Sequence, residues 1–148
     1  MVAIGHSAGG HLALWLGGRD GDALSLRSIV SLAGVADLRR AFEMALSNTV
    51  VADFLGGSPD AVPERYRHAS PIERLPLGIP QRLIHGTQDD IVPLEIARTY
   101  ETAAVARGDD AKLIALPGAG HFELVDPRTP EWRVVEATVL ALLGPDQV

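Results

Sequence analysis

The sequence predicts an α/β fold built on a mostly parallel sheet with flanking helices. Short apolar segments typical of buried strands alternate with longer segments whose apolar residues recur at helical spacing. This alternation is typical of βαβ units, in which consecutive strands run parallel and helices cover the sheet. One hydrophobic core usually serves a chain of 148 residues, so we expect a single domain over residues 1–148.

The first predicted unit is a strand, a tight turn and a helix. Residues 1–4 form an apolar run, and residues 7–16 are rich in Ala and Leu before two glycines end the helix. Residues 28–33 predict a second, buried strand. Asp37 follows that strand as a helix N-cap, because its carboxylate can accept from free N–H groups of the first turn. The helix after it has an apolar stripe formed by Leu38, Ala41, Phe42, Ala45 and Leu46.

The middle of the chain is rich in proline. Residues 48–80 contain five prolines. Proline removes a backbone donor and clashes with the preceding turn of a helix, so we expect short helical turns and irregular chain here. We interpret this segment as a candidate lid or pocket wall.

The remaining residues predict two more strands and two helices. Residues 81–85 and 111–116 are short apolar strands, and the helix between them starts near Pro93 and stops at Gly108. These elements make a second βαβ unit. The last helix is bounded by Thr129 as N-cap, Pro130 at the first helical position, and Gly144 and Pro145 at its end.

Composition excludes several classes of partner and site. The 13 basic side chains are outnumbered by 19 acidic ones, for a net charge of −6, which opposes binding to nucleic acid or to an anionic membrane. The absence of cysteine excludes disulfides and thiolate metal sites. The sequence shows no leader and no apolar run long enough to span a bilayer, so we expect a soluble, cytoplasmic protein.

The strongest chemical signal is a Gly-x-Ser-x-Gly string. Residues 5–9 read GHSAG and stand between a predicted strand and a predicted helix, the context in which this motif presents a nucleophilic serine. Ser7 is therefore the candidate nucleophile. The backbone N–H of Ala8 is the candidate oxyanion donor, because it follows the nucleophile at a helix N-terminus.

A serine nucleophile needs a base, and the base needs an orienting carboxylate. Asp89 and Asp90 lie in the loop after the strand over residues 81–85, and His121 lies in the loop after the next strand. Carboxyl ends of parallel strands share one edge of a sheet, so these groups are predicted to gather near Ser7.

With these residues in view, the chain resembles the C-terminal half of an α/β-hydrolase. It is similar to the esterase, kynurenine-formamidase-like and prolyl-oligopeptidase-like branches, because GHSAGGHLALW, HGTQDDIVP and GAGHF occur in the family's order. The resemblance implies that Ser7 is the nucleophile, that Asp89 rather than Asp90 orients the base, and that His121 is the base. A serine, a histidine and a carboxylate need no cofactor, so we expect none, and the spacing of His6 and His11 predicts no metal site.

The sequence also departs from that family. A full α/β-hydrolase has further strands before the nucleophile strand and a loop that supplies a second oxyanion donor, whereas here this strand begins at Met1. We therefore expect a partial fold without the N-terminal strands, with an open apolar edge, and hypothesise a truncated product or a piece of a larger enzyme. Loss of one oxyanion donor costs about 100- to 1000-fold in turnover.

These observations favour a serine hydrolase that cleaves a carboxylic ester through an acyl-enzyme. Amide cleavage by an arylformamidase-type enzyme and short-peptide cleavage by a peptidase of the prolyl-oligopeptidase (S9) type share the same mechanism and stay open. A catalytically impaired remnant is the alternative from another class. The residues predicted to contact a small-molecule ester, amide or peptide substrate are His6, Asp37, Phe54 and Tyr66.

Overall fold

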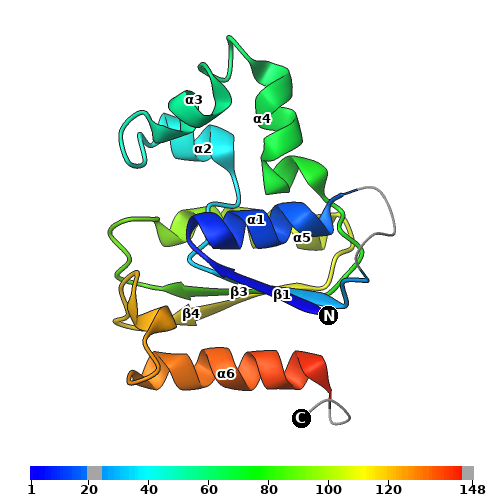
Figure 1. Cartoon of the computed structure of the whole chain (residues 1–148), viewed down its shortest axis with the longest axis vertical. Coiled ribbons are helices and arrows are strands. Elements are labelled where there is room, and N and C mark those ends of the chain that lie inside the picture. The colour runs from blue at the N-terminus through cyan, green and yellow to red at the C-terminus, as the bar shows by residue number, and fades with distance from the viewer. Residues whose placement is uncertain (20–24, 145–148) are drawn as a thin grey trace.

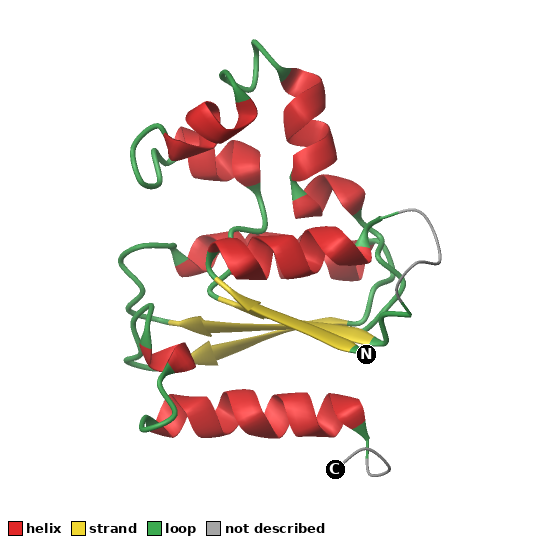
Figure 2. Cartoon of the chain, in the orientation of Figure 1, coloured by secondary structure: helices red, strands yellow, loops and turns green. Residues whose placement is uncertain are grey.

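The computed structural model describes residues 1–19 and 25–144. In these ranges four parallel strands form one sheet in the order β1-β2-β3-β4 (Figure 2). Because all three pairings are parallel, the carboxyl ends of all four strands lie at one edge. The strands are β1 (Val2–His6), β2 (Ser28–Leu32), β3 (Gln81–Gly86) and β4 (Ala111–Leu116).

Helices cover both faces of this sheet (Figure 1). Helices α1 (Ala8–Gly17) and α5 (Leu94–Ala106) pack on one face, and α6 (Pro130–Leu143) lies along the other. The predicted α/β fold with a parallel sheet and flanking helices is therefore confirmed. Three short helices between β2 and β3 stand over α1 as an outer layer: α2 (Leu38–Glu43), and from the proline-rich segment α3 (Val50–Leu55) and α4 (Pro63–Ala69). Two single turns complete the described elements, η1 (Pro71–Arg74) and η2 (Glu123–Val125).

The core has two parts, one on each side of the sheet. Every residue of β2 is buried, and neighbouring side chains of a strand point to opposite faces. Ile29 accordingly packs with Leu14 on the α1 side, whereas Val30 packs with Val135 of α6 on the other. Strand β1 lies at one edge of the sheet, and its Ile4 is 46% exposed, as the sequence predicts for that strand.

The predicted caps form. The Asp37 carboxylate accepts from Arg40 N at 3.0 Å, and Thr129 Oγ1 accepts from Trp132 N at 3.3 Å. Pro130 is the first residue of α6, and Gly144 follows its last residue. The predicted contribution of Pro145 lies outside the described residues.

One predicted helix is shorter than its apolar stripe. Helix α2 ends at Glu43, whereas the stripe continues to Leu46. Leu46 N donates to Ala41 O at 3.0 Å and Ala45 N donates to Phe42 O at 3.0 Å, the two bonds of a Schellman ending. The residue in the left-handed conformation is Ala45, with φ of 51°, where glycine is usual. The prediction is wrong at this boundary because no glycine marks the stop.

The proline-rich segment has the predicted character, since α3 and α4 have six and seven residues. Within the two described ranges, no helix combines the length and apolar character that crossing a membrane requires.

Candidate active site

Ser7 occupies a strained turn between β1 and α1. Its backbone has φ of 55° and ψ of −117°, a conformation that L-residues rarely adopt and that costs about 1–3 kcal/mol. Gly5 permits the turn, because a Cβ atom there would lie 2.1 Å from Gly9 O. Ser7 N donates to Leu32 O at 2.8 Å, which ties the turn to the end of β2. The serine predicted as nucleophile therefore stands at the carboxyl edge of the sheet.

The N-terminus of α1 begins directly after the serine. Ala8 is its first residue and His11 N donates to Ser7 O at 3.0 Å. The N–H of a first helical residue has no acceptor within the helix and lies at the positive end of the helix dipole. Ala8 N–H, the predicted oxyanion donor, is therefore a backbone donor next to Ser7 with no acceptor within the helix.

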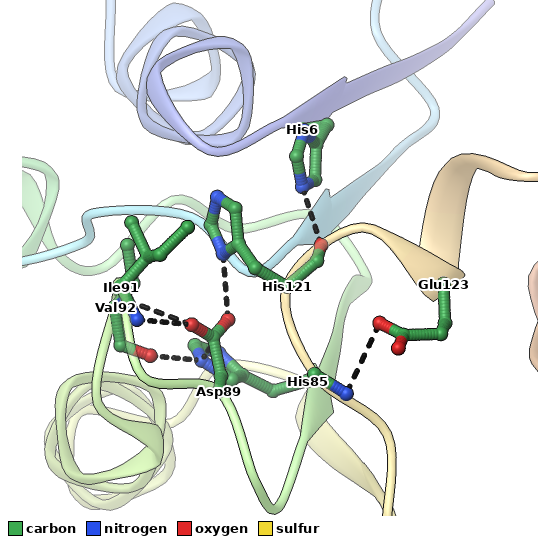
Figure 3. Close-up of polar contacts among 8 residues, drawn as sticks. His6, His85, Asp89, Ile91, Val92, His121 and Glu123 are labelled. Atoms are coloured by element: carbon green, nitrogen blue, oxygen red, sulfur yellow. Dashed lines mark hydrogen bonds and ion pairs between the residues drawn. The ribbon is translucent and has the colours of Figure 1, made fainter.

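The predicted base and acid meet at the same edge (Figure 3). His121 Nδ1 donates to Asp89 Oδ2 at 2.7 Å. The Asp89 carboxylate is 0% exposed and the His121 side chain 3% exposed. A buried, charge-assisted bond of this kind fixes the imidazole tautomer and leaves Nε2 as the nitrogen that can accept a proton.

Asp89 is held on its other side by its own loop. Its Oδ1 accepts from Ile91 N at 2.9 Å and from Val92 N at 2.8 Å (Figure 3). Asp90, the neighbouring acid, is exposed. Of the two acids that the spacing leaves open, Asp89 is therefore the one that contacts His121.

Close packing brings the acid loop and the base loop together. A Cβ atom at Gly86 would lie 2.2 Å from Ala119 O and 2.4 Å from Gly120 O. Across the same contact, Gln88 N donates to Ala119 O at 2.9 Å. Gly86 is thus required by the approach of the loop that carries His121.

His85 lies beneath the Asp89 carboxylate. Its Nε2 donates to Val92 O at 2.7 Å and lies 3.4 Å from Asp89 Oδ2. The bond to a local carbonyl is the ordinary one for a histidine before a loop glycine, whereas the approach to Asp89 has no signal in sequence spacing. Burial lowers the pKa of His85, although Val92 O and Asp89 oppose this change.

His6 binds the loop of the base rather than facing open solvent. Its Nε2 donates to the carbonyl oxygen of His121 at 2.8 Å, and the two imidazole centroids are 4.5 Å apart (Figure 3). Phe122 packs edge-on against His121 at 5.1 Å. The ring predicted to touch substrate thus contacts the residue predicted as the base.

Ser7 and His121 are gathered at this edge without a direct bond. Among the described residues, no hydrogen bond joins Ser7 Oγ to His121. Catalytic hydrogen bonds are often long in a free enzyme and shorten when substrate binds.

The other three residues predicted to contact substrate lie in three different places: a cavity wall, the core and a helix cap. Phe54 is 68% exposed and lines an apolar cavity of about 310 Å³ that also includes Ala8. Tyr66 is 1% exposed and its hydroxyl donates to Gly57 O at 3.1 Å. The ring of Tyr66 packs in the core and does not line this cavity. Asp37 is occupied as the cap of α2.

Within residues 1–19 and 25–144, no three His, Asp or Glu side chains are grouped to hold a metal ion. His11 instead donates from Nε2 to Ala69 O at 2.8 Å, and its burial lowers its pKa. It ties α1 to the end of α4.

Comparison with known proteins shows the family of the chain. Residues 1–138 match the prolyl oligopeptidase family of peptidases. The chain belongs to this family. It is also 35% identical to esterase LipC of Mycobacterium tuberculosis over an alignment of 148 residues. The alignment covers 85% of this chain and 36% of the esterase.

Solved structures share the fold. Acylaminoacyl peptidase of Pyrococcus horikoshii superposes with a TM-score of 0.75 at 18% identity, over 93% of this chain and 22% of the peptidase. Esterase 2 of Thermogutta terrifontis superposes with a TM-score of 0.67 at 25% identity, over 95% of this chain and 52% of the esterase. The fold is that of the α/β-hydrolases, and the chain spans between about a fifth and half the length of these solved relatives and about a third of esterase LipC.

Proposed function

We propose that the chain is a serine hydrolase that cleaves carboxylic esters. The observation that carries the proposal is the buried bond of 2.7 Å from His121 Nδ1 to Asp89 Oδ2, at the sheet edge where Ser7 stands in a strained turn. Membership of a peptidase family and likeness to an esterase support a hydrolase of this type.

The proposed reaction has two halves. Ser7 Oγ attacks the ester carbonyl carbon while His121 Nε2 takes the hydroxyl proton, and Asp89 stabilises the resulting imidazolium. Ala8 N–H donates to the oxyanion of the tetrahedral intermediate. The C–O bond to the leaving alcohol breaks and His121 returns the proton to that oxygen. Water, activated by the same imidazole, then cleaves the acyl-Ser7 ester.

Two observations divide the possible substrates. The relative with 35% identity is an esterase, and the cavity beside Ala8 has an apolar lining suited to an acyl group. Peptide or other amide cleavage is the second candidate, favoured by the family match and by the superposition on an acylaminoacyl peptidase. Parallel assays with a p-nitrophenyl ester and a peptide p-nitroanilide would distinguish the two.

Labelling with a fluorophosphonate probe tests the proposal directly. We expect one adduct on the 148-residue chain, located by mass spectrometry at Ser7. Ser7→Ala should abolish the adduct, and His121→Ala should slow its formation strongly because the hydroxyl is then not activated. Ser47→Ala, at an exposed serine in a loop, is the matched control and should label like the parent. Circular dichroism would establish that each variant is folded.

A folded chain that is not labelled at Ser7, or that is labelled equally well after His121→Ala, would overturn the proposed nucleophile and base.

A further inference from the structure

Two apolar cavities lie next to each other along α1. The inner cavity, of about 310 Å³, lies between the start of α1, the chain after β2, and α3; Ala8, Val35 and Val51 are among its walls. The outer cavity, of about 250 Å³, continues toward the end of α1 and α4, and its walls include Trp15, His68 and Ala69. The inner cavity contains the residue that follows Ser7.

Three side chains belong to both cavities. His11, Leu12 and Phe54 line the inner cavity and the outer cavity alike. His11 is fixed by its bond to Ala69 O. Leu12 and Phe54 are 55% and 68% exposed, and because both line the inner and the outer cavity, they lie where the two cavities meet. These two side chains therefore form a removable partition.

Both cavities suit an uncharged apolar chain. No Asp, Glu, Lys or Arg is among their lining residues. Burial lowers the pKa of His11, which keeps the histidine common to both cavities neutral at pH 7. An alkyl group entering them gains by leaving water, whereas a charged group would lose its hydration without a partner.

We propose that the two cavities are one acyl trough, and that Phe54, with Leu12, sets the length of acyl chain that Ser7 can receive. The proposal rests on the proposed function, because the trough begins at Ala8 beside the nucleophile. In the parent chain the acyl group fills the inner cavity and stops at Phe54. Removal of the partition lets a longer chain continue along α1 to Trp15.

Hydrolysis of p-nitrophenyl esters from acetate to dodecanoate tests the proposal. In the parent we expect kcat/KM to rise by up to about fourfold per added CH₂ while the inner cavity fills, and then to fall. Phe54→Ala should move the optimum to longer chains and raise the dodecanoate-to-butyrate ratio by at least about tenfold. Adding Ala69→Leu, which fills only the outer cavity, should cancel the gain. Val105→Ala, at an exposed valine of α5, should leave the profile unchanged.

A binding measurement separates the trough from catalysis. In a chain carrying Ser7→Ala and Trp132→Phe, Trp15 is the remaining tryptophan. Methyl 12-bromododecanoate should quench its fluorescence more strongly after Phe54→Ala, because the bromine then reaches the outer cavity.

The two proposals fail differently. Ser7-dependent hydrolysis with the same chain-length profile in parent and Phe54→Ala would overturn the trough and keep the hydrolase. Absence of hydrolysis, together with quenching that depends on Phe54, would overturn the hydrolase and keep the trough.

Discussion

Asp89 and Asp90 differ in which of them can contact the imidazole of His121. The two acids are adjacent in sequence, yet the Asp89 carboxylate is buried against His121 while Asp90 is exposed. The difference arises because Asp89 Oδ1 accepts from two N–H groups of the turn that follows, which points Oδ2 at the imidazole. Sequence spacing brings both acids to the edge, the family resemblance favours Asp89, and the local turn gives the physical reason.

Asp89→Asn is expected to lower kcat for ester hydrolysis by about 10⁴-fold, because an amide can stabilise the wrong tautomer and cannot neutralise the imidazolium. Asp90→Asn should change kcat less than about twofold, since that side chain is exposed. Steady-state kinetics on a p-nitrophenyl ester would measure both. Equal losses in the two variants would contradict the assignment of Asp89.

His6 is expected to act as a positioning residue for His121. His6→Phe removes the donor to the His121 carbonyl and should lower kcat by about 10- to 100-fold with little change in KM, because the base is displaced and the acyl trough is not. His6→Gln, which can still donate, should recover part of kcat. Recovery of kcat in His6→Gln would show that the donor to the His121 carbonyl matters and that the loss in His6→Phe is not due to misfolding. An equally low kcat in His6→Phe and His6→Gln would contradict the positioning role.

At the scale of elements, caps and turns explain which predictions succeed. Asp37 and Thr129 act as caps because their side chains reach free N–H groups three residues away, an interaction that sequence alone can indicate. The end of α2 is missed because Ala45 takes the left-handed position without a glycine. The sequence predicts a substrate contact for Phe54 but misses Leu12, since the two side chains line the same cavities only through the packing of α3 over α1.

Thr129→Ala should lower the free energy of unfolding by about 1 kcal/mol, because the first turn of α6 loses the acceptor for Trp132 N. Thr102→Ala is the matched control: Thr102 is exposed in the interior of α5, where alanine favours the helix, so its free energy of unfolding should stay equal or rise slightly. Urea unfolding followed by circular dichroism would compare them. Equal effects at both sites would contradict a capping role.

At the scale of the molecule, most of the site follows from topology. Four parallel strands in chain order bring the loops of Ser7, Asp89 and His121 to one edge, which is why widely separated motifs predict the arrangement from sequence. Tyr66 shows the limit of this reasoning. An aromatic residue in the proline-rich segment is as compatible with the core as with a pocket, and only the packing of α4 decides that its ring is buried.

Two buried histidines should make the stability of the whole fold depend on pH. Burial lowers the pKa of His11 and of His85 from 6.5; their rings face Ala69 O in the first case, and Val92 O, Asp89, His121 and His6 in the second. Above about pH 6.5 both histidines are neutral in the folded and unfolded states, so stability is at its full value. As pH falls below 6.5 the unfolded chain binds protons first, and stability decreases by up to about 1.4 kcal/mol per pH unit for each histidine.

Urea unfolding between pH 7.5 and pH 5 measures this decrease. Asp126, whose pKa Arg128 lowers to about 2, stays ionised throughout that range and does not contribute. The variant with His11→Gln and His85→Gln keeps a donor for Ala69 O and for Val92 O but cannot bind the proton, so its stability should be nearly constant over the same range. A decrease that is equally steep in this variant would assign the pH dependence to other groups, and would mean that both histidines can be protonated within the folded protein.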